Sequence, residues 1–177
     1  TEDYVTGRST YAHMAGILDQ ATGRMAAGLI YFPEAMRLYI AVRGMGAFVA
    51  DGLWGALRPL AAAQPPRSVG DVKRLTGADR DAFRRLGVEV VPPESASAAH
   101  ELMRVAQGHV GAMVMRHFHG HDLAIPGVII EELGGAVLDA SGRTARFEKA
   151  MPRIPLIVLS LSPTFARELV GELEKSL

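Results

Sequence analysis

The sequence contains no cysteine, and this absence excludes several classes of protein. A disulfide-stabilised scaffold, a zinc site with thiolate ligands and a cysteine nucleophile all require that residue. A chain without cysteine also fits a reducing compartment, so we expect a cytoplasmic protein.

Neither sign of charge is in excess, and long apolar runs are missing. Lys and Arg total 19, as do Asp and Glu, so the formal net charge is zero. Binders of nucleic acid or of anionic membranes need an excess of basic residues, so we expect neither partner. No apolar run approaches the ~18 residues of a membrane helix, and the first residues do not have the pattern of a signal peptide.

The composition is that of a packed globular domain. Hydrophobic residues make up 49% and charged residues 21% of the 177 residues. A chain of this length can bury roughly 70% of its unfolded surface. It begins at Thr1 rather than at Met, which predicts that it has been processed or belongs to a longer chain.

The first third of the chain has the pattern of a meandering antiparallel sheet. Apolar segments bounded by turn residues predict a series of strands, and Asp51-Gly52 is a strong signal for a two-residue hairpin. The predicted strands are residues 11–18, 25–32, 37–42, 47–50 and 53–57.

Residues 59–66 form a Pro/Ala-rich connector, which we predict to separate an N-terminal sheet domain (1–58) from a C-terminal α/β domain (67–177). Beyond the connector, helix patterns alternate with short apolar strands, which indicates an α/β layout. We expect helices over residues 79–86, 95–107, 122–133 and 162–173, and strands over residues 88–91, 112–118, 136–138 and 156–159.

Asp122 stands at the predicted N-cap of the third of these helices, with Pro126 in the first turn. An Asp in this place can simply cap the helix and complement its dipole. It can also bind a hard cation such as Mg²⁺, which takes carboxylate oxygens and keeps water and substrate phosphate at its other positions. One carboxylate does not decide between the two.

Several segments together carry a resemblance to a known family. Asp122-x-Ala-x-x-Gly, followed by an apolar turn and Glu-x-Gly-Gly-x-x-x-Asp139, resembles the C-terminal signature of the inositol monophosphatase family of Mg²⁺-dependent phosphatases. Residues 95–108 are similar to its Gly-Ser-Ala-Ala helix and residues 28–48 to its middle region. The first residues resemble the segment that comes after Asp-Pro-x-Asp-Gly in the family, with Thr1 as the last residue of that motif. The resemblance covers nearly the whole chain, as the C-terminal two-thirds of a member.

The resemblance implies a fold and an activity. Members fold as a layered α/β/α/β sandwich, with an antiparallel sheet portion followed by a smaller α/β portion. They hydrolyse phosphate monoesters with two or three Mg²⁺ ions and would act here as a homodimer. The family's metal carboxylates are an early Glu, two Asp of the Asp-Pro-x-Asp-Gly-Thr motif, and the Asp that matches Asp122.

The resemblance also assigns roles to individual residues. Asp122 would be a metal ligand. Thr1 would be catalytic, contacting the phosphate and orienting the attacking water, and His121 would flank the substrate. The wall facing the substrate's hydroxyls would be formed by Ala96, Ser97 and Ala98.

Three departures from the family pattern bear on the substrate. His121 replaces the usual Trp, Ala96 replaces a Gly, and Met115 stands where some members carry a Glu that contacts a substrate hydroxyl. These changes predict a small phosphorylated polyol, sugar or nucleotide other than inositol monophosphate.

The start at Thr1 leads to a further expectation. The early Glu and the two Asp of the first motif would precede it, so we expect these residues to be an inactive fragment that holds no Mg²⁺ by itself. The sheet over residues 11–57 should then expose apolar surface. The alternative from a different class is a catalytically dead binding or structural remnant of the fold.

Two other patterns suggest different chemistry. His117, His119 and His121 alternate as residues on one face of a strand do, which could supply imidazole ligands to zinc or iron. No distal fourth ligand accompanies them, so an approach to a phosphate site is favoured. An N-terminal Thr1 could be the nucleophile of an acyl-transfer enzyme, but the phosphatase-like pattern downstream argues against it.

Overall fold

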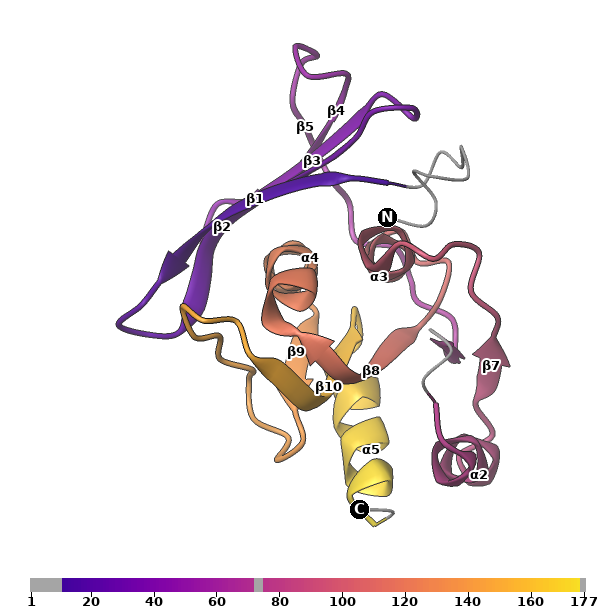
Figure 1. Ribbon diagram of the computed structural model, residues 1–177. Coiled ribbons are helices and arrows are strands. Elements are labelled where there is room, and N and C mark those ends of the chain that lie inside the picture. Colours follow the sequence, from indigo (N-terminus) through magenta and orange to yellow (C-terminus); the bar gives the residue numbers. More distant parts are fainter. Residues whose placement is uncertain (1–10, 72–74, 176–177) are drawn as a thin grey trace.

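The computed structural model describes residues 11–71 and 75–175, in which two sheets alternate with two layers of helices (Figure 1). The first sheet is antiparallel throughout, in the order β1-β2-β3-β4-β5. Its strands are β1 (His13–Asp19), β2 (Arg24–Phe32), β3 (Arg37–Val42), β4 (Gly46–Asp51) and β5 (Arg58–Pro59).

The second sheet is mixed and has the order β7-β6-β8-β10-β9. Its short strand β6 runs parallel to β7 and β8, while β10 is antiparallel to β8 and β9. The strands are β6 (Ser68–Gly70), β7 (Glu89–Val91), β8 (Ala112–His119), β9 (Ala136–Asp139) and β10 (Arg153–Ser160).

Four described helices complete the layers: α2 (Gly77–Arg85), α3 (Ala98–Ala106), α4 (Gly120–Glu132) and α5 (Pro163–Glu174). Helices α3 and α4 lie between the two sheets, and α2 and α5 lie on the far side of the second sheet (Figure 1). The predicted layered α/β sandwich is therefore confirmed.

The middle layer explains why α4 has little amphipathic character. Its side chains meet a sheet on both sides, so Leu123, Val128, Ile129 and Ile130 are all buried. The helix also approaches β2 closely, because a Cβ on Gly28 would lie 2.8 Å from Val128 Cγ1.

One hydrophobic cluster unites the first sheet, the middle helices and the second sheet. It contains Ile30 and Tyr39 from the first sheet, Val128 from α4 and Ile157 from β10. The chain passes from the first sheet to the second between Pro59 and Ser68. The division into domains at residues 59–66 stays a prediction.

The hairpin predicted after Asp51-Gly52 is wrong in its second strand. Strand β4 ends at Asp51 as expected, but residues 53–57 form an exposed turn, and β5 is only two residues long. The apolar residues there have no layer to pack on, and the Trp54 side chain is 97% exposed. Strand propensity without a surface to cover does not produce a strand.

The predicted start of α4 is also wrong, because the helix begins before Asp122. Its N-cap is His119, and Gly120 N–H donates to the Pro152 carbonyl (3.1 Å), so the chain turns from β8 directly into the helix. Pro126 therefore lies in the second turn, where it cannot donate the helical hydrogen bond to the Asp122 carbonyl.

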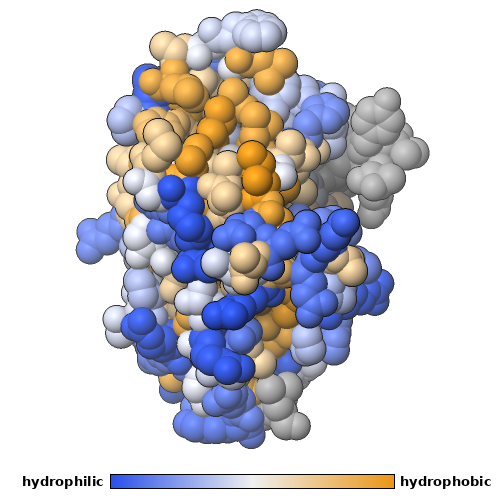
Figure 2. Space-filling model, turned by 90° about the vertical axis from the view of Figure 1, so that its left-hand side faces the viewer, coloured by the Kyte–Doolittle hydropathy of each residue, from blue (hydrophilic) through white to orange (hydrophobic). Residues whose placement is uncertain are grey.

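Exposed apolar residues gather on the first sheet and its loops. Figure 2 shows hydrophobic residues over the upper part of this side of the molecule and hydrophilic residues below. The expectation that residues 11–57 expose apolar surface is confirmed. The large exposed side chains are Ile17, Met36, Met45, Leu53, Trp54 and Leu57. None of the helices in the described ranges is long and apolar enough to cross a membrane.

Candidate functional site

The residues predicted for the site lie at the beginnings of two helices, α3 and α4, which pack against each other. Ser97 is the N-cap of α3, and its Oγ accepts a hydrogen bond from His100 N–H (3.4 Å). Ala96 is exposed just before the cap, while Ser97 and Ala98 are half-buried. The three residues predicted to face the substrate thus form the entrance to one helix.

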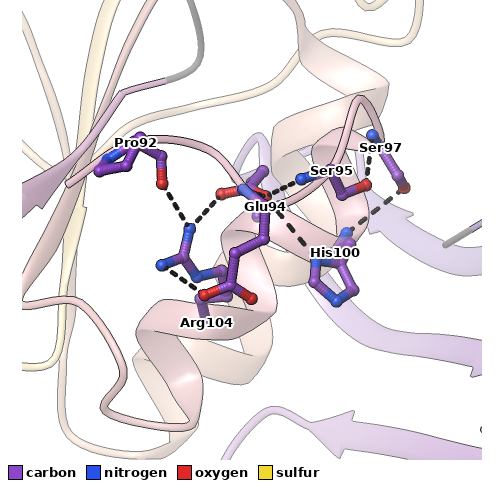
Figure 3. A network of polar contacts seen from close by, with 7 residues as sticks. Pro92, Glu94, Ser95, Ser97, His100 and Arg104 are labelled. Atoms are coloured by element: carbon purple, nitrogen blue, oxygen red, sulfur yellow. Dashed lines mark hydrogen bonds and ion pairs between the residues drawn. The ribbon is translucent and has the colours of Figure 1, made fainter.

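A buried carboxylate anchors the loop that carries these residues (Figure 3). Glu101, which is 1% exposed, accepts hydrogen bonds at Oε1 from the N–H groups of Glu94 (2.9 Å) and Ser95 (2.8 Å). Its Oε2 accepts a hydrogen bond from Arg104 Nη1 (2.8 Å). The loop before Ser97 is therefore held from inside the protein.

Arg104 completes this network. Its guanidinium is buried, donates to the Pro92 carbonyl (3.2 Å) and pairs with Glu94 Oε1 (2.9 Å). Burial by itself would raise the pKa of the Glu101 carboxyl, but His100 Nδ1, 3.7 Å away, and the Arg104 guanidinium hold that pKa below its usual range. Glu101 is consequently charged at neutral pH despite its burial.

Asp122 occupies the third position of α4, where a negative charge complements the helix dipole. Its side chain is 29% exposed, and Oδ1 lies 3.5 Å from His121 Nε2. His121 is itself 61% exposed. The predicted ligand is thus accessible and lies beside the residue predicted to flank the substrate.

The strand that carries the histidines is irregular at His117. His117 has a positive φ of 54° and lies between the Arg116–Leu156 and Phe118–Ile154 pairs, opposite Pro155. This irregularity breaks the alternation of β8. Within residues 11–71 and 75–175, no group of three or more His, Asp or Glu side chains is arranged to hold a metal ion. The histidine-site hypothesis is therefore not supported.

His119 and His121 instead stack on each other. Their ring centroids are 5.3 Å apart with an interplanar angle of 18°. His119 Nε2 accepts a hydrogen bond from Arg153 Nε (3.1 Å). Arg153 begins β10, so the start of α4 is tied to the neighbouring strand.

Behind the site, β8 is fixed by an ion pair that the sequence reasoning missed. Arg116 donates from Nε and Nη2 to the two carboxylate oxygens of Asp79 (2.8 and 2.6 Å), and Asp79 has no exposed surface. Asp79 also accepts from Thr76 N–H in the capping box of α2. Burial raises the pKa of Asp79, but the Arg116 and Thr76 hydrogen bonds outweigh it and lower that pKa.

Met115 does not face the candidate site. Its side chain is fully buried in the hydrophobic cluster between the sheets. It therefore contributes to the core, while the buried charge of β8 is carried by the next residue, Arg116.

The other residues of the C-terminal signature have structural roles. Glu132 Oε2 accepts from Gly44 N–H (3.0 Å) and Gly46 N–H (2.9 Å), which ties α4 to the β3–β4 turn. Asp139 Oδ1 accepts from Ser141 N–H (2.8 Å) in the turn after β9. Asp122 is partly exposed, as these two acids are, but among the described residues no backbone N–H donates to its carboxylate.

The Gly-Gly pair of the signature is explained by backbone geometry. Gly134 ends α4 with φ at 84°, a conformation that L-residues rarely adopt. Gly135 has no room for a side chain, because a Cβ there would lie 2.4 Å from the Ser160 carbonyl oxygen. These two residues allow the chain to leave α4 and enter β9 directly against β10.

Comparison with known proteins identifies the family. The model of the inositol monophosphatase family matches residues 1–176, so this chain belongs to that family and the resemblance seen in the sequence is confirmed. No curated protein matches the chain. Thr1, the predicted catalytic residue, lies outside the described residues.

Solved structures share the fold at low sequence identity. A hypothetical protein from Pyrococcus horikoshii with similarities to inositol-1 monophosphatase has a TM-score of 0.75 and 19% identity, over 97% of this chain and 65% of its own. The inositol monophosphatase of Anabaena has a TM-score of 0.73 and 21% identity, and the match covers 99% of this chain and 71% of that structure. CysQ of Bacteroides thetaiotaomicron has a TM-score of 0.72 and 19% identity, and the match covers 91% of this chain and 66% of that structure. The chain spans about two-thirds of the length of these structures.

Proposed function

We propose that the intact protein is a Mg²⁺-dependent hydrolase of phosphate monoesters. Its substrate would be a small phosphorylated polyol, sugar or nucleotide. Family membership over residues 1–176 supports the reaction class. The observation that carries the assignment to this site is the accessible Asp122 carboxylate at the start of α4.

The chemistry of Asp122 fits a hard divalent cation. Mg²⁺ prefers carboxylate oxygens and keeps several water ligands, so a partly exposed carboxylate suits it better than a buried one. Arginines neutralise Asp79 and Glu131, but the described part of the chain places none against Asp122. When bound, the ion would lower the pKa of a water molecule and neutralise the leaving oxygen.

The chain's own residues would then position the phosphate ester. Gly120 N–H already donates to the Pro152 carbonyl, but the next N–H groups of the first turn of α4 have no acceptor within the helix, and they favour a phosphate oxygen. Ala96, Ser97 and Ala98 would face the organic part of the substrate from the anchored entrance to α3. His121 would contact the substrate beside Asp122, and Thr1 would contact the phosphate and the attacking water.

Further parts of the proposal concern the protein as a whole. We propose that it is a cytoplasmic homodimer and that its metal is Mg²⁺. The 177 residues on their own would be inactive, because one carboxylate binds Mg²⁺ weakly without others and without substrate phosphate. Inositol monophosphate would not be the preferred substrate.

Phosphate release by the full-length protein tests this function. We expect hydrolysis of a panel of phosphate monoesters that requires Mg²⁺ and stops when a chelator is added. A folded full-length protein that releases no phosphate from any member of the panel would instead be the catalytically dead remnant. An equal rate with and without chelator would contradict the metal dependence.

A further inference from the structure

The start of β2 lies beside the loop between β9 and β10 (Figure 1), and a cavity of about 760 Å³ opens between them. Its lining includes Arg24 from β2, Asp139 from the end of β9, and residues 143–146 of the loop. Its volume falls within the range of about 300–1,000 Å³ typical of small-molecule sites. Neither His121 nor Asp122 lines this cavity, so it is separate from the candidate site at the start of α4.

Backbone hydrogen bonds fix the loop wall of this cavity. Phe147 N–H donates to the Gly23 carbonyl (2.7 Å), and Ala145 N–H donates to the Val137 carbonyl (2.9 Å). Phe147 and Ala145 are buried in the hydrophobic cluster between the sheets, while Arg146 between them is exposed. The cavity is therefore largely formed before a ligand binds, which lowers the entropic cost of binding.

Basic side chains outnumber acidic ones in the lining. Among the described residues, Arg24, Arg143 and Arg146 line the cavity together with a single carboxylate, that of Asp139. Asp139 Oδ1 already accepts hydrogen bonds from Ser141 N–H (2.8 Å) and Arg143 N–H (3.2 Å), so it holds the turn after β9. A cavity with such an excess of positive charge attracts anions.

Arg24 has a shared counter-charge and an unused donor. Its Nη2 donates to Glu131 Oε1 (2.7 Å), but Glu131 Oε2 accepts a hydrogen bond from Arg43 Nη2 (2.7 Å). One carboxylate thus serves two guanidinium groups, which leaves a positive charge uncompensated. Arg24 Nε is buried and, within the described ranges, has no hydrogen-bond partner. A buried donor without a partner is costly, and an acceptor atom from a ligand would remove this cost.

The two arginines of the loop have donors available for a ligand. Arg143 Nε donates to Ser141 Oγ (2.8 Å), which orients its guanidinium, and its Nη groups have no partner among the residues that the structure describes. Arg146 makes no hydrogen bond or ion pair in that part of the chain. A planar guanidinium can donate two parallel hydrogen bonds to one carboxylate or phosphate group, so it binds such groups in a defined geometry.

We propose that this cavity binds a small organic molecule that carries two or more phosphate or carboxylate groups. Arg24 binds one group from the sheet, and Arg143 and Arg146 bind another from the loop. A single inorganic ion would fill only a small part of the cavity, whereas a molecule with two separated anionic groups reaches both walls. The inference does not depend on the proposed phosphatase function, because the residues of the candidate site do not line the cavity.

Titration calorimetry on the full-length protein, freed of divalent cations on a chelating resin, measures this binding without turnover. The probes are propane-1,3-diol bisphosphate and citrate. We expect at least one of them to bind, with an affinity that falls as salt is added. Propyl phosphate and acetate, which have one anionic group each, should bind roughly tenfold more weakly, because they contact one wall only. Tighter binding of the bisphosphate would assign phosphate groups to the ligand, and tighter binding of citrate would assign carboxylates.

Substitution of the loop arginines locates the bound anion. Arg143→Gln and Arg146→Gln change exposed side chains, so both variants should fold normally. We expect each to weaken binding of the better probe roughly threefold to tenfold, as the loss of a charged hydrogen bond at a partly exposed site does. Arg167→Gln is the matched control, because it removes the same charge from an exposed position of α5 on the far side of the second sheet. It should leave the affinity unchanged.

Several results would overturn this site. One is that neither probe binds to the full-length protein. Another is that Arg143→Gln and Arg146→Gln bind the probes as tightly as wild type does, which would place the anion elsewhere. An equal loss of affinity in Arg167→Gln would show attraction to the overall charge and not to a built site. None of these results bears on Mg²⁺-dependent phosphate release, and a protein that releases no phosphate could still bind the probes in this cavity.

Discussion

The residues of the family signature have two kinds of role. Most of them stabilise the fold, and one lies at the candidate site. Glu132, Gly135 and Asp139 are occupied by contacts with neighbouring turns and strands. Asp122 is partly exposed like Glu132 and Asp139, but in the described part of the chain no backbone N–H donates to its carboxylate. The sequence pattern identified all four but could not distinguish these roles, because the partners of Glu132 and Gly135 lie far away along the chain.

Gly135 provides a test of this division. We expect Gly135→Ala to destabilise the protein by about 1–3 kcal/mol, because the new methyl group would press against the Ser160 carbonyl oxygen. Gly171→Ala is the control, since a Cβ in that exposed position of α5 meets nothing within 4 Å. It should stabilise the protein by up to about 1 kcal/mol. Equal unfolding free energies for the two variants in urea would refute this account of Gly135.

The Asp79–Arg116 ion pair should make the stability of the protein depend on pH. The pKa of Asp79 is lowered in the folded protein, so the pair adds stability above the unfolded pKa of about 3.9 and loses it as pH falls through the folded pKa. Asp79→Asn should cost about 3–5 kcal/mol near neutral pH, because it leaves Arg116 buried without its counter-charge.

Urea unfolding of wild type and Asp79→Asn at a series of pH values measures this cost. The difference between the two proteins should shrink below about pH 4. Asp81→Asn, at an exposed ion pair on the same helix, should change stability by no more than about 1 kcal/mol at any pH. If the difference in unfolding free energy between wild type and Asp79→Asn did not change with pH, the assigned ion pair would be contradicted.

Whole elements could be predicted where local chemistry decides their ends. Ser162 caps α5 as the sequence indicated, and apolar segments bounded by turn residues gave β2 and β3. Helix α3 was predicted from residue 95, but it begins after its N-cap Ser97. Prediction failed where a distant contact decides. Helix α4 begins before Asp122, where Gly120 N–H donates to the distant Pro152 carbonyl. Residues 53–57 do not form a strand, because they have no layer to pack against. Three-residue β6 is too short to show a pattern.

The loop before α3 carries Ala96 and Ser97 and is held by the buried Glu101 carboxylate. We expect Glu101→Gln to accelerate hydrogen exchange at the N–H groups of Glu94 and Ser95 and to lower kcat/KM for the proposed phosphate ester hydrolysis by the full-length protein. The amide leaves Arg104 with only the exposed Glu94 carboxylate as its counter-charge.

Glu94→Gln is the matched control, because it removes the exposed partner of the same arginine and should cost no more than about 1 kcal/mol. Exchange is followed by mass spectrometry, and both variants are assayed well below their melting temperatures. Unchanged exchange over residues 92–97 in Glu101→Gln would contradict the anchoring role.

At the scale of the whole molecule, the sequence predicted the layered fold through its resemblance to the family and not through composition. Four segments in the right order indicated two sheets with helices between them, and the structure has this arrangement. The buried pairs Asp79–Arg116 and Glu101–Arg104 were not predicted. The first joins residues 37 positions apart, and the second lies on a helix face that only tertiary packing buries.

The central claim is that Asp122 binds the metal of a phosphate monoester hydrolase, and its most direct test is phosphate release by the full-length Asp122→Asn variant. Asn keeps the size of the side chain but removes the charge that a hard cation requires. We predict a melting temperature close to that of wild type, with activity lower by orders of magnitude at saturating Mg²⁺, while the control Asp81→Asn keeps both. Phosphate release by Asp122→Asn at the wild-type rate would contradict the account.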